Sequence, residues 1–172
     1  MGIVRIDDAM MTFHRPLAAL ALATSAVLTF AKEPAVPAHS VTGPFDVKLA
    51  PQVLSDVAAQ SSLGRMSLDK RFHGALDATS TGEMIAFRSA VAGSAGYVAM
   101  ETVRGTLDGR AGSFVLQHSS TMTRGEPQQS ITVVPDSGTD ALVGLSGRMV
   151  VEIAPGGAHA YRFDYSLPDV AR

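Results

Sequence analysis

A lysine and a glutamate stand where the residue pattern predicts the inside of a sheet. Lys70 alternates in phase with apolar neighbours such as Leu68, and Glu101 alternates in phase with Tyr97 and Val103. A cation on an apolar face must find a partner or change its ionisation. The two residues therefore predict a Lys70–Glu101 pair and a candidate site. Two alternatives stay open: a slipped register, or a lysine at the rim whose stem reaches solvent.

Two neighbouring residues, Gln117 and His118, compete for the same interior. His118 is in phase with Phe114 and Leu116, whereas Gln117 has the opposite phase, so only one can face inward. An inward His118 beside Glu101 could act as a general base near neutral pH. A hydrogen-bonded core or rim histidine is the structural alternative. We keep both residues as candidates.

The chain has three tyrosines, Tyr97, Tyr161 and Tyr165, and all of them fall in alternating segments. A buried phenol needs a hydrogen-bond partner, and Lys70 and Glu101 are available for this. An apolar pocket with a few polar points is the usual build of a small-molecule site. The rings could equally fill the interior of the fold.

The segment Asp136-Ser137-Gly138-Thr139 reads as a turn. We expect Asp136 to cap backbone N–H groups and Gly138 to take a positive φ. The same loop could bind an anion through its N–H groups at the mouth of a barrel.

Several kinds of chemistry are excluded or disfavoured. The chain has no cysteine, which removes disulfides, thiol nucleophiles and Cys-ligated zinc. The histidines His73, His118 and His159 show no local ligand spacing, and no Gly-x-Ser-x-Gly motif occurs. We therefore expect neither a metal nor a cofactor. A net charge of −2 and the absence of tryptophan disfavour nucleic acid as a partner.

The residues that carry these side chains belong to about eight short alternating segments at hairpin spacing, which predicts an all-β domain. An eight-stranded antiparallel β-barrel, lipocalin-like, is wide enough to be filled or to hold one small ligand. A two-sheet sandwich is the alternative, and Gly105 inside a long segment favours the barrel. Turns are expected at 80–82, 93–96, 108–110 and 155–157. The expected strands are 45–49, 65–73, 83–91, 97–107, 113–122, 130–134, 145–153 and 159–167.

The first part of the chain has the pattern of a targeting sequence. An uncharged apolar run ends at Ala31, so we assign residues 1–31 to a signal peptide. The acidic residues before Met11 place the true start at Met11 or Met10. Residues 32–42 form a flexible leader, and the domain spans 43–168. We expect an exported bacterial protein, periplasmic or extracellular, without stable membrane insertion after cleavage. An uncleaved N-terminal anchor is the alternative.

Five segments in order resemble the DUF3224 family, a bacterial family of unknown function: 64–74, 82–84, 93–101, 112–118 and 133–139. The resemblance spans Pro44 to Pro168. It implies a barrel similar to that of allene oxide cyclase. The segment from Ser137 to Gly147 also resembles a turn of allene oxide cyclases and dirigent proteins. The resemblance implies no activity, because function must come from the site.

These observations favour an exported, noncatalytic barrel that binds a small, partly apolar ligand in its lumen. One alternative, by analogy only, is an isomerase or cyclase like allene oxide cyclase, with Glu101 as the buried carboxylate. Another is a structural barrel with a filled lumen that self-associates as a homo-oligomer. Lumen volume separates them, because a cavity of roughly 300 Å³ or more is typical of ligand sites.

Overall fold

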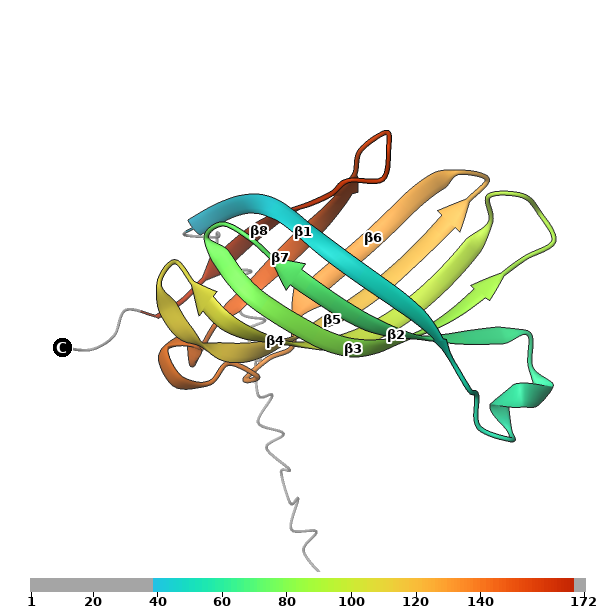
Figure 1. Ribbon diagram of the computed structural model, residues 1–172, viewed down its shortest axis with the longest axis horizontal. Coiled ribbons are helices and arrows are strands. Elements are labelled where there is room, and N and C mark those ends of the chain that lie inside the picture. Colours follow the sequence, from blue (N-terminus) through green and yellow to red (C-terminus); the bar gives the residue numbers. More distant parts are fainter. Residues whose placement is uncertain (1–38, 169–172) are drawn as a thin grey trace, which may run out of the picture. The chain divides into compact units, whose positions relative to one another are not determined.

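The computed structural model describes residues 39–168. Eight antiparallel strands close into a barrel in which each strand pairs with the next and β8 pairs back with β1 (Figure 1). Two short 3-10 turns, η1 (Ala58–Gln60) and η2 (Asp140–Leu142), lie in the connections. The all-β fold and the eight-stranded barrel are confirmed, and closure of the sheet excludes the sandwich. The strands are β1 (His39–Gln52), β2 (Leu63–Phe72), β3 (Leu76–Arg88), β4 (Ala95–Leu107), β5 (Arg110–Thr123), β6 (Glu126–Val133), β7 (Ser146–Ile153) and β8 (His159–Ser166).

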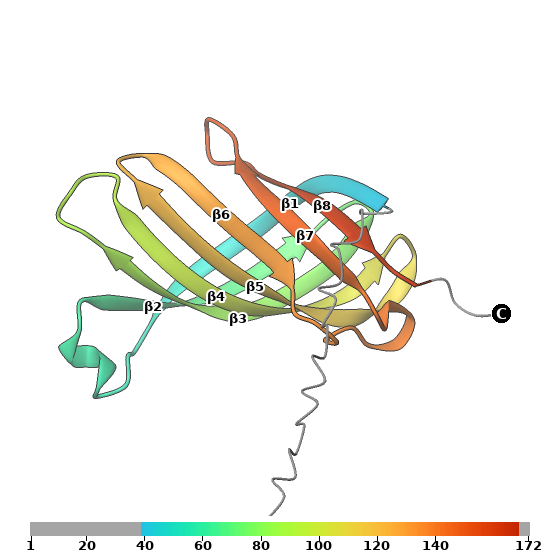
Figure 2. The same ribbon diagram turned by 180° about the vertical axis from the view of Figure 1, so that it is seen from behind.

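The two ends of the barrel differ (Figure 2). At one end, here called the closed end, lie the β2–β3 and β4–β5 turns and the β6–β7 loop that carries η2. Leu142 of η2 is 1% exposed and belongs to the core cluster. The opposite end, the open end, carries the other four connections. The core includes large side chains from the closed half of the barrel: Phe72, Leu76, Leu107, Phe114 and Phe163.

Strict alternation along the strands decides which side chains enter the barrel. On β4, Ala99, Glu101 and Val103 are buried, whereas Val98 and Met100, which flank Ala99, are exposed. This is the period of two that a half-buried strand requires. A charged residue in this phase is therefore carried into the interior together with its apolar neighbours.

The expected turn at 80–82 is wrong, because β3 runs through it without interruption. Gly82 is required there for a different reason. A Cβ on Gly82 would lie 2.1 Å from the carbonyl oxygen of Met100 and 2.7 Å from Cα of Glu101. The chain turns earlier, at Gly74, which has a φ of +96°. Gly82 thus marks a close approach of two strands and does not mark a reversal of the chain.

The boundary of the leader also needs correction. β1 begins at His39, and residues 39–42 pair with β8. The last four residues of the expected leader therefore belong to the barrel wall. The expected signal peptide, 1–31, lies outside the described residues. Within residues 39–168, no helix is long and apolar enough to cross a membrane.

Candidate functional site

Three strands bring Lys70, Glu101 and His118 into contact at the middle of the barrel. Lys70 Nζ donates to Glu101 Oε1 over 2.8 Å, and His118 Nε2 lies 2.9 Å from the same oxygen. Ser80 Oγ donates to the other oxygen, Oε2, over 2.7 Å. These four side chains are exposed by 7% or less. They form one connected polar group, which we call the buried cluster.

The carboxyl group of Glu101 is ionised despite its burial. Burial by itself would raise the pKa of Glu101, but the hydrogen bond to His118, the charge of Lys70 and the remaining bonds lower it to about 2. The ammonium of Lys70 also lies 5.5 Å and 5.8 Å from the ring centroids of Phe45 and Phe72. Such cation–π contacts further stabilise a desolvated cation.

The side-chain hydrogen bonds of the buried cluster stay within the cluster. Both carboxylate oxygens of Glu101 already accept hydrogen bonds. In residues 39–168, no buried side-chain nitrogen or oxygen lacks a partner. A general base needs a lone pair that can reach substrate, and here Oε1 of Glu101 is hydrogen-bonded to Lys70 and His118 and Oε2 to Ser80. The cluster therefore has the chemistry of a structural ion pair set into an apolar core.

Tyr161 and Tyr165 are buried inside the barrel, but their hydroxyls do not partner Lys70 or Glu101, which corrects that expectation. The Tyr161 hydroxyl donates to the carbonyl of His73 over 2.9 Å and accepts from the N–H of Leu76 over 3.1 Å. It thereby braces the β2–β3 turn.

The Tyr165 hydroxyl donates to Asp108 Oδ2 over 2.5 Å at the β4–β5 turn. Burial raises the pKa of Tyr165 to about 12, and the hydrogen bond and charge of Asp108 add to the shift. Both phenols thus stabilise turns of the closed end.

Gln117 faces outward and is exposed, so His118 is the member of that pair that faces the interior. The segment 136–139 lies at the closed end. There Ser137 Oγ accepts from the N–H of Val115 over 3.1 Å, and Thr139 Oγ1 accepts from the N–H of Ser113 over 3.0 Å.

The expected roles of Asp136 and Gly138 were wrong. The positive φ, +59°, belongs to Asp136. Position 138 has no room for a side chain, because a Cβ on Gly138 would lie 1.9 Å from the carbonyl oxygen of Leu142. The side-chain hydrogen bonds that fasten this loop to β5 come from Ser137 and Thr139.

The open end is hollowed where Tyr97 lies. A hollow of about 150 Å³ opens between β3, β4 and β5, and mainly apolar residues surround it. Burial raises the pKa of Tyr97, a contact with Ser120 opposes this shift, and the charge of Glu101 adds to it. The residues lining the hollow are Met84, Ala86, Phe87, Arg88, Ala95, Gly96, Tyr97, Ser120, Thr121 and Met122.

Sequence reasoning missed Ser80. The signal was present, because Leu76, Ala78 and Ser80 alternate in phase and continue to Met84. The triplet Ser80-Thr81-Gly82 was interpreted as a turn, which broke that alternation. A reading of 76–88 as one strand would have placed Ser80 inward.

Among residues 39–168, no group of three or more histidine, aspartate or glutamate side chains is placed to hold a metal ion. The residues that the sequence proposed as one site thus separate in space. Lys70, Glu101 and His118 meet, Tyr97 lies at the open end, Tyr161, Tyr165 and the loop 136–139 lie at the closed end, and Gln117 lies outside.

Comparison with known proteins agrees with this architecture. The solved structures include a protein of unknown function from the DUF3224 family of Shewanella oneidensis MR-1, with a TM-score of 0.71. It is 48% identical in sequence, and the match covers 77% of this chain and 98% of that one. No curated protein matched. A family model described as "Protein of unknown function (DUF3224)" matches residues 41–165, which include all eight strands in whole or in part, and the chain therefore belongs to the DUF3224 family.

Proposed function

We propose that this protein is an exported, noncatalytic barrel that binds a small apolar group in its open end. The observation that carries the proposal is the hollow of about 150 Å³ beside Tyr97. It is smaller than the roughly 300 Å³ of a typical ligand pocket. It matches a single ring, since an apolar cavity of about 150 Å³ accepts benzene. The ligand would therefore insert one ring or a short branch.

The inward-facing side chains near the open end support the same proposal. Met66 and Met84 are half-buried, whereas Leu49, Met122 and Ile153 are 48%, 41% and 64% exposed although they share the inward phase of their strands. The inner surface of the barrel near the open end is thus apolar although solvent reaches it. Methionine side chains are flexible and polarizable, so they adapt to ligands of different shape. The phenol of Tyr97 and the hydroxyl of Ser120 supply polar points at the hollow.

The buried cluster has a supporting role in this proposal. Its ionised Glu101 lies at mid-barrel with both oxygens occupied, so it positions strands β2, β3, β4 and β5 below the hollow. The cyclase alternative requires a carboxylate that can respond to substrate, and no contact of Glu101 favours it.

The test uses indole as a probe and two matched alanine-to-tryptophan variants. Ala86 lines the hollow, whereas Ala111 is exposed on the outside of β5. In methyl-labelled protein, indole should shift the methionine signals of Met84 and Met122 and leave Met149, which is 1% exposed in the core, unchanged. Ala86→Trp should abolish the shifts and Ala111→Trp should keep them. Equal responses of the two variants would contradict the proposal.

Native mass spectrometry of protein purified from its own host then identifies the physiological ligand. A retained small molecule that Ala86→Trp protein lacks would define its class. Protein that is free of any bound species and insensitive to indole would leave the filled-lumen alternative in place.

A further inference from the structure

Exposed apolar side chains gather on one part of the outer wall. Leu63 pairs with Phe87 across β2 and β3, and Ile85 pairs with Val98 across β3 and β4. Phe87, Val98 and the adjacent Met100 are 45%, 57% and 49% exposed. Ile85 is half-buried and lies beside these exposed side chains. We call the five residues the wall patch. Single exposed apolar residues are common on soluble proteins, but a contiguous set marks an interaction surface.

The outer faces of β4 and β5 carry little charge. On the outer face of β4 the charged side chain is Arg104, two residues beyond Thr102. The outer face of β5 carries none: its side chains are Ala111, Ser113, Val115, Gln117, Ser119, Thr121 and Thr123. Depletion of charge is what distinguishes the core of a protein interface from ordinary surface.

The wall on the β1 and β2 side of the wall patch shows the contrast. The outer faces of β1 and β2 carry Asp46, Lys48, Arg65, Asp69 and Arg71. The barrel therefore has a charged side and an uncharged side, and the wall patch lies where the uncharged side meets β2.

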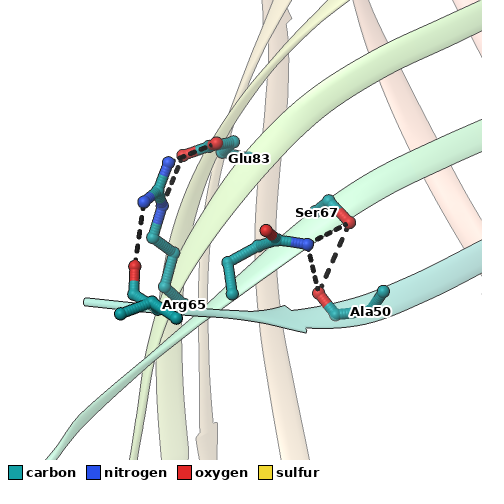
Figure 3. A network of polar contacts seen from close by, with 6 residues as sticks. Ala50, Arg65, Ser67 and Glu83 are labelled. Atoms are coloured by element: carbon teal, nitrogen blue, oxygen red, sulfur yellow. Dashed lines mark hydrogen bonds and ion pairs between the residues drawn. The ribbon is translucent and has the colours of Figure 1, made fainter.

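Arg65 and Glu83 form an ion pair (Figure 3). It forms the rim of the wall patch, because Arg65 lies opposite Ile85 in the register of β2 and β3. Arg65 donates from Nε to Glu83 Oε2 over 2.7 Å and from a terminal nitrogen to Oε1 over 2.5 Å. Its remaining terminal nitrogen donates to the carbonyl of Val53 over 2.9 Å. Glu83 in turn lies opposite Met100 in the register of β3 and β4. A cation and an anion thus stand side by side at the edge of an apolar surface.

We propose that the wall patch binds a second copy of this chain in a two-fold symmetric dimer. In such an interface the same surface meets itself, so residue i of one copy faces residue j of the other and the reverse. An edge that carries one cation and one anion is complementary to itself in this arrangement. Arg65 of each copy would face Glu83 of the other around an apolar centre. An anionic membrane or a nucleic acid would be attracted by Arg65 but repelled by Glu83.

The first experiment measures the mass of the full chain by sedimentation equilibrium over a micromolar concentration series. We expect a dimer whose dissociation constant rises by about ten-fold or more in Val98→Lys, because an interface core does not tolerate an unpaired charge. Val143→Lys is the matched control, since Val143 is 64% exposed in the closed-end loop. A monomeric wild-type chain, or equal dissociation constants for the two variants, would overturn the proposal.

The second experiment tests the Arg65–Glu83 rim by mixing two charge-reversed variants. Arg65→Glu leaves two carboxylates at the rim of one chain, and Glu83→Arg leaves two guanidinium groups at the rim of another. Each variant alone should dimerise more weakly than the wild type, whereas an equimolar mixture should form heterodimers. Association that is unchanged in each variant alone, or a mixture no tighter than its components, would show that these charges act only within one chain.

Discussion

The carboxylate of Glu101 is the residue on which the interior depends most. Three donors, Lys70, Ser80 and His118, satisfy both of its oxygens. Removing one partner of a buried ion pair leaves an uncompensated charge in a low-dielectric medium, whereas replacing both by apolar groups does not. The interaction free energy of the Lys70–Glu101 pair can therefore be measured only when both residues are changed together.

A double-mutant cycle measures this coupling. Lys70→Met should lower the free energy of unfolding in urea by about 3–5 kcal/mol, because it leaves Glu101 without its cation. Lys70→Met combined with Glu101→Leu should recover much of that loss. A coupling energy below about 0.5 kcal/mol would contradict the contact. Arg71→Met, on the exposed side of the same strand, should cost less than about 1 kcal/mol.

The stability of the protein should also depend on pH through Glu101. Its pKa in the folded chain is about 2, below the ordinary value of 4.5. The unfolded chain therefore takes up a proton first as the pH falls, so the stabilisation is complete above 4.5 and is lost towards pH 2. The loss should be on the order of 3 kcal/mol. Urea unfolding across this window should show a shallower acid decline in Glu101→Gln, and parallel declines would contradict the assignment.

Among the elements, β3 is the one that positions the buried cluster most directly. Its inward residues run from Leu76 through Ser80 to Met84 without a break. Ser80 reaches Glu101 because Gly82, the next inward residue, lets β3 and β4 approach closely. A side chain at that position would push the two strands apart.

Gly82→Ala should therefore destabilise the barrel by about 1–3 kcal/mol, the usual cost of overpacking a well-packed interior. The atom in the way is the backbone oxygen of Met100, which cannot rotate aside. Gly64→Ala is the matched control on β2, since the nearest atom to its added Cβ lies 4.0 Å away. Chemical denaturation of the two variants compares them, and equal stabilities would refute this account of Gly82.

At the scale of the whole molecule, we expect export to remove the N-terminal residues. The uncharged run before Ala31 motivates the prediction, and β1 begins only at His39, so cleavage near residue 32 would leave the barrel intact. N-terminal sequencing of native protein should begin at or near Lys32. A mature chain that still starts at Met1 or Met11 would refute it.

The sequence by itself determined the class of fold and the composition of the interior. Alternation of period two identifies the inward residues Lys70, Glu101 and His118, because successive side chains of a strand point to opposite faces whatever the neighbouring strands are. The hairpin at Asp108 and Gly109 was equally readable, since both residues take the positive φ that a tight turn requires. These features depend on local geometry alone.

Only the tertiary structure decided which inward residues meet. The register of β2, β3, β4 and β5 brings Ser80 and His118 to one carboxylate. The pairing of β8 with β1 and β7 carries Tyr161 and Tyr165 to the turns of the closed end. Alternation states the face of a side chain but not its height along the barrel, because height depends on how far neighbouring strands are shifted past each other. The same limit applies to Gly82, whose close contacts come from the neighbouring strand β4. Faces are local properties of the chain, whereas distances across a barrel are set by its closure.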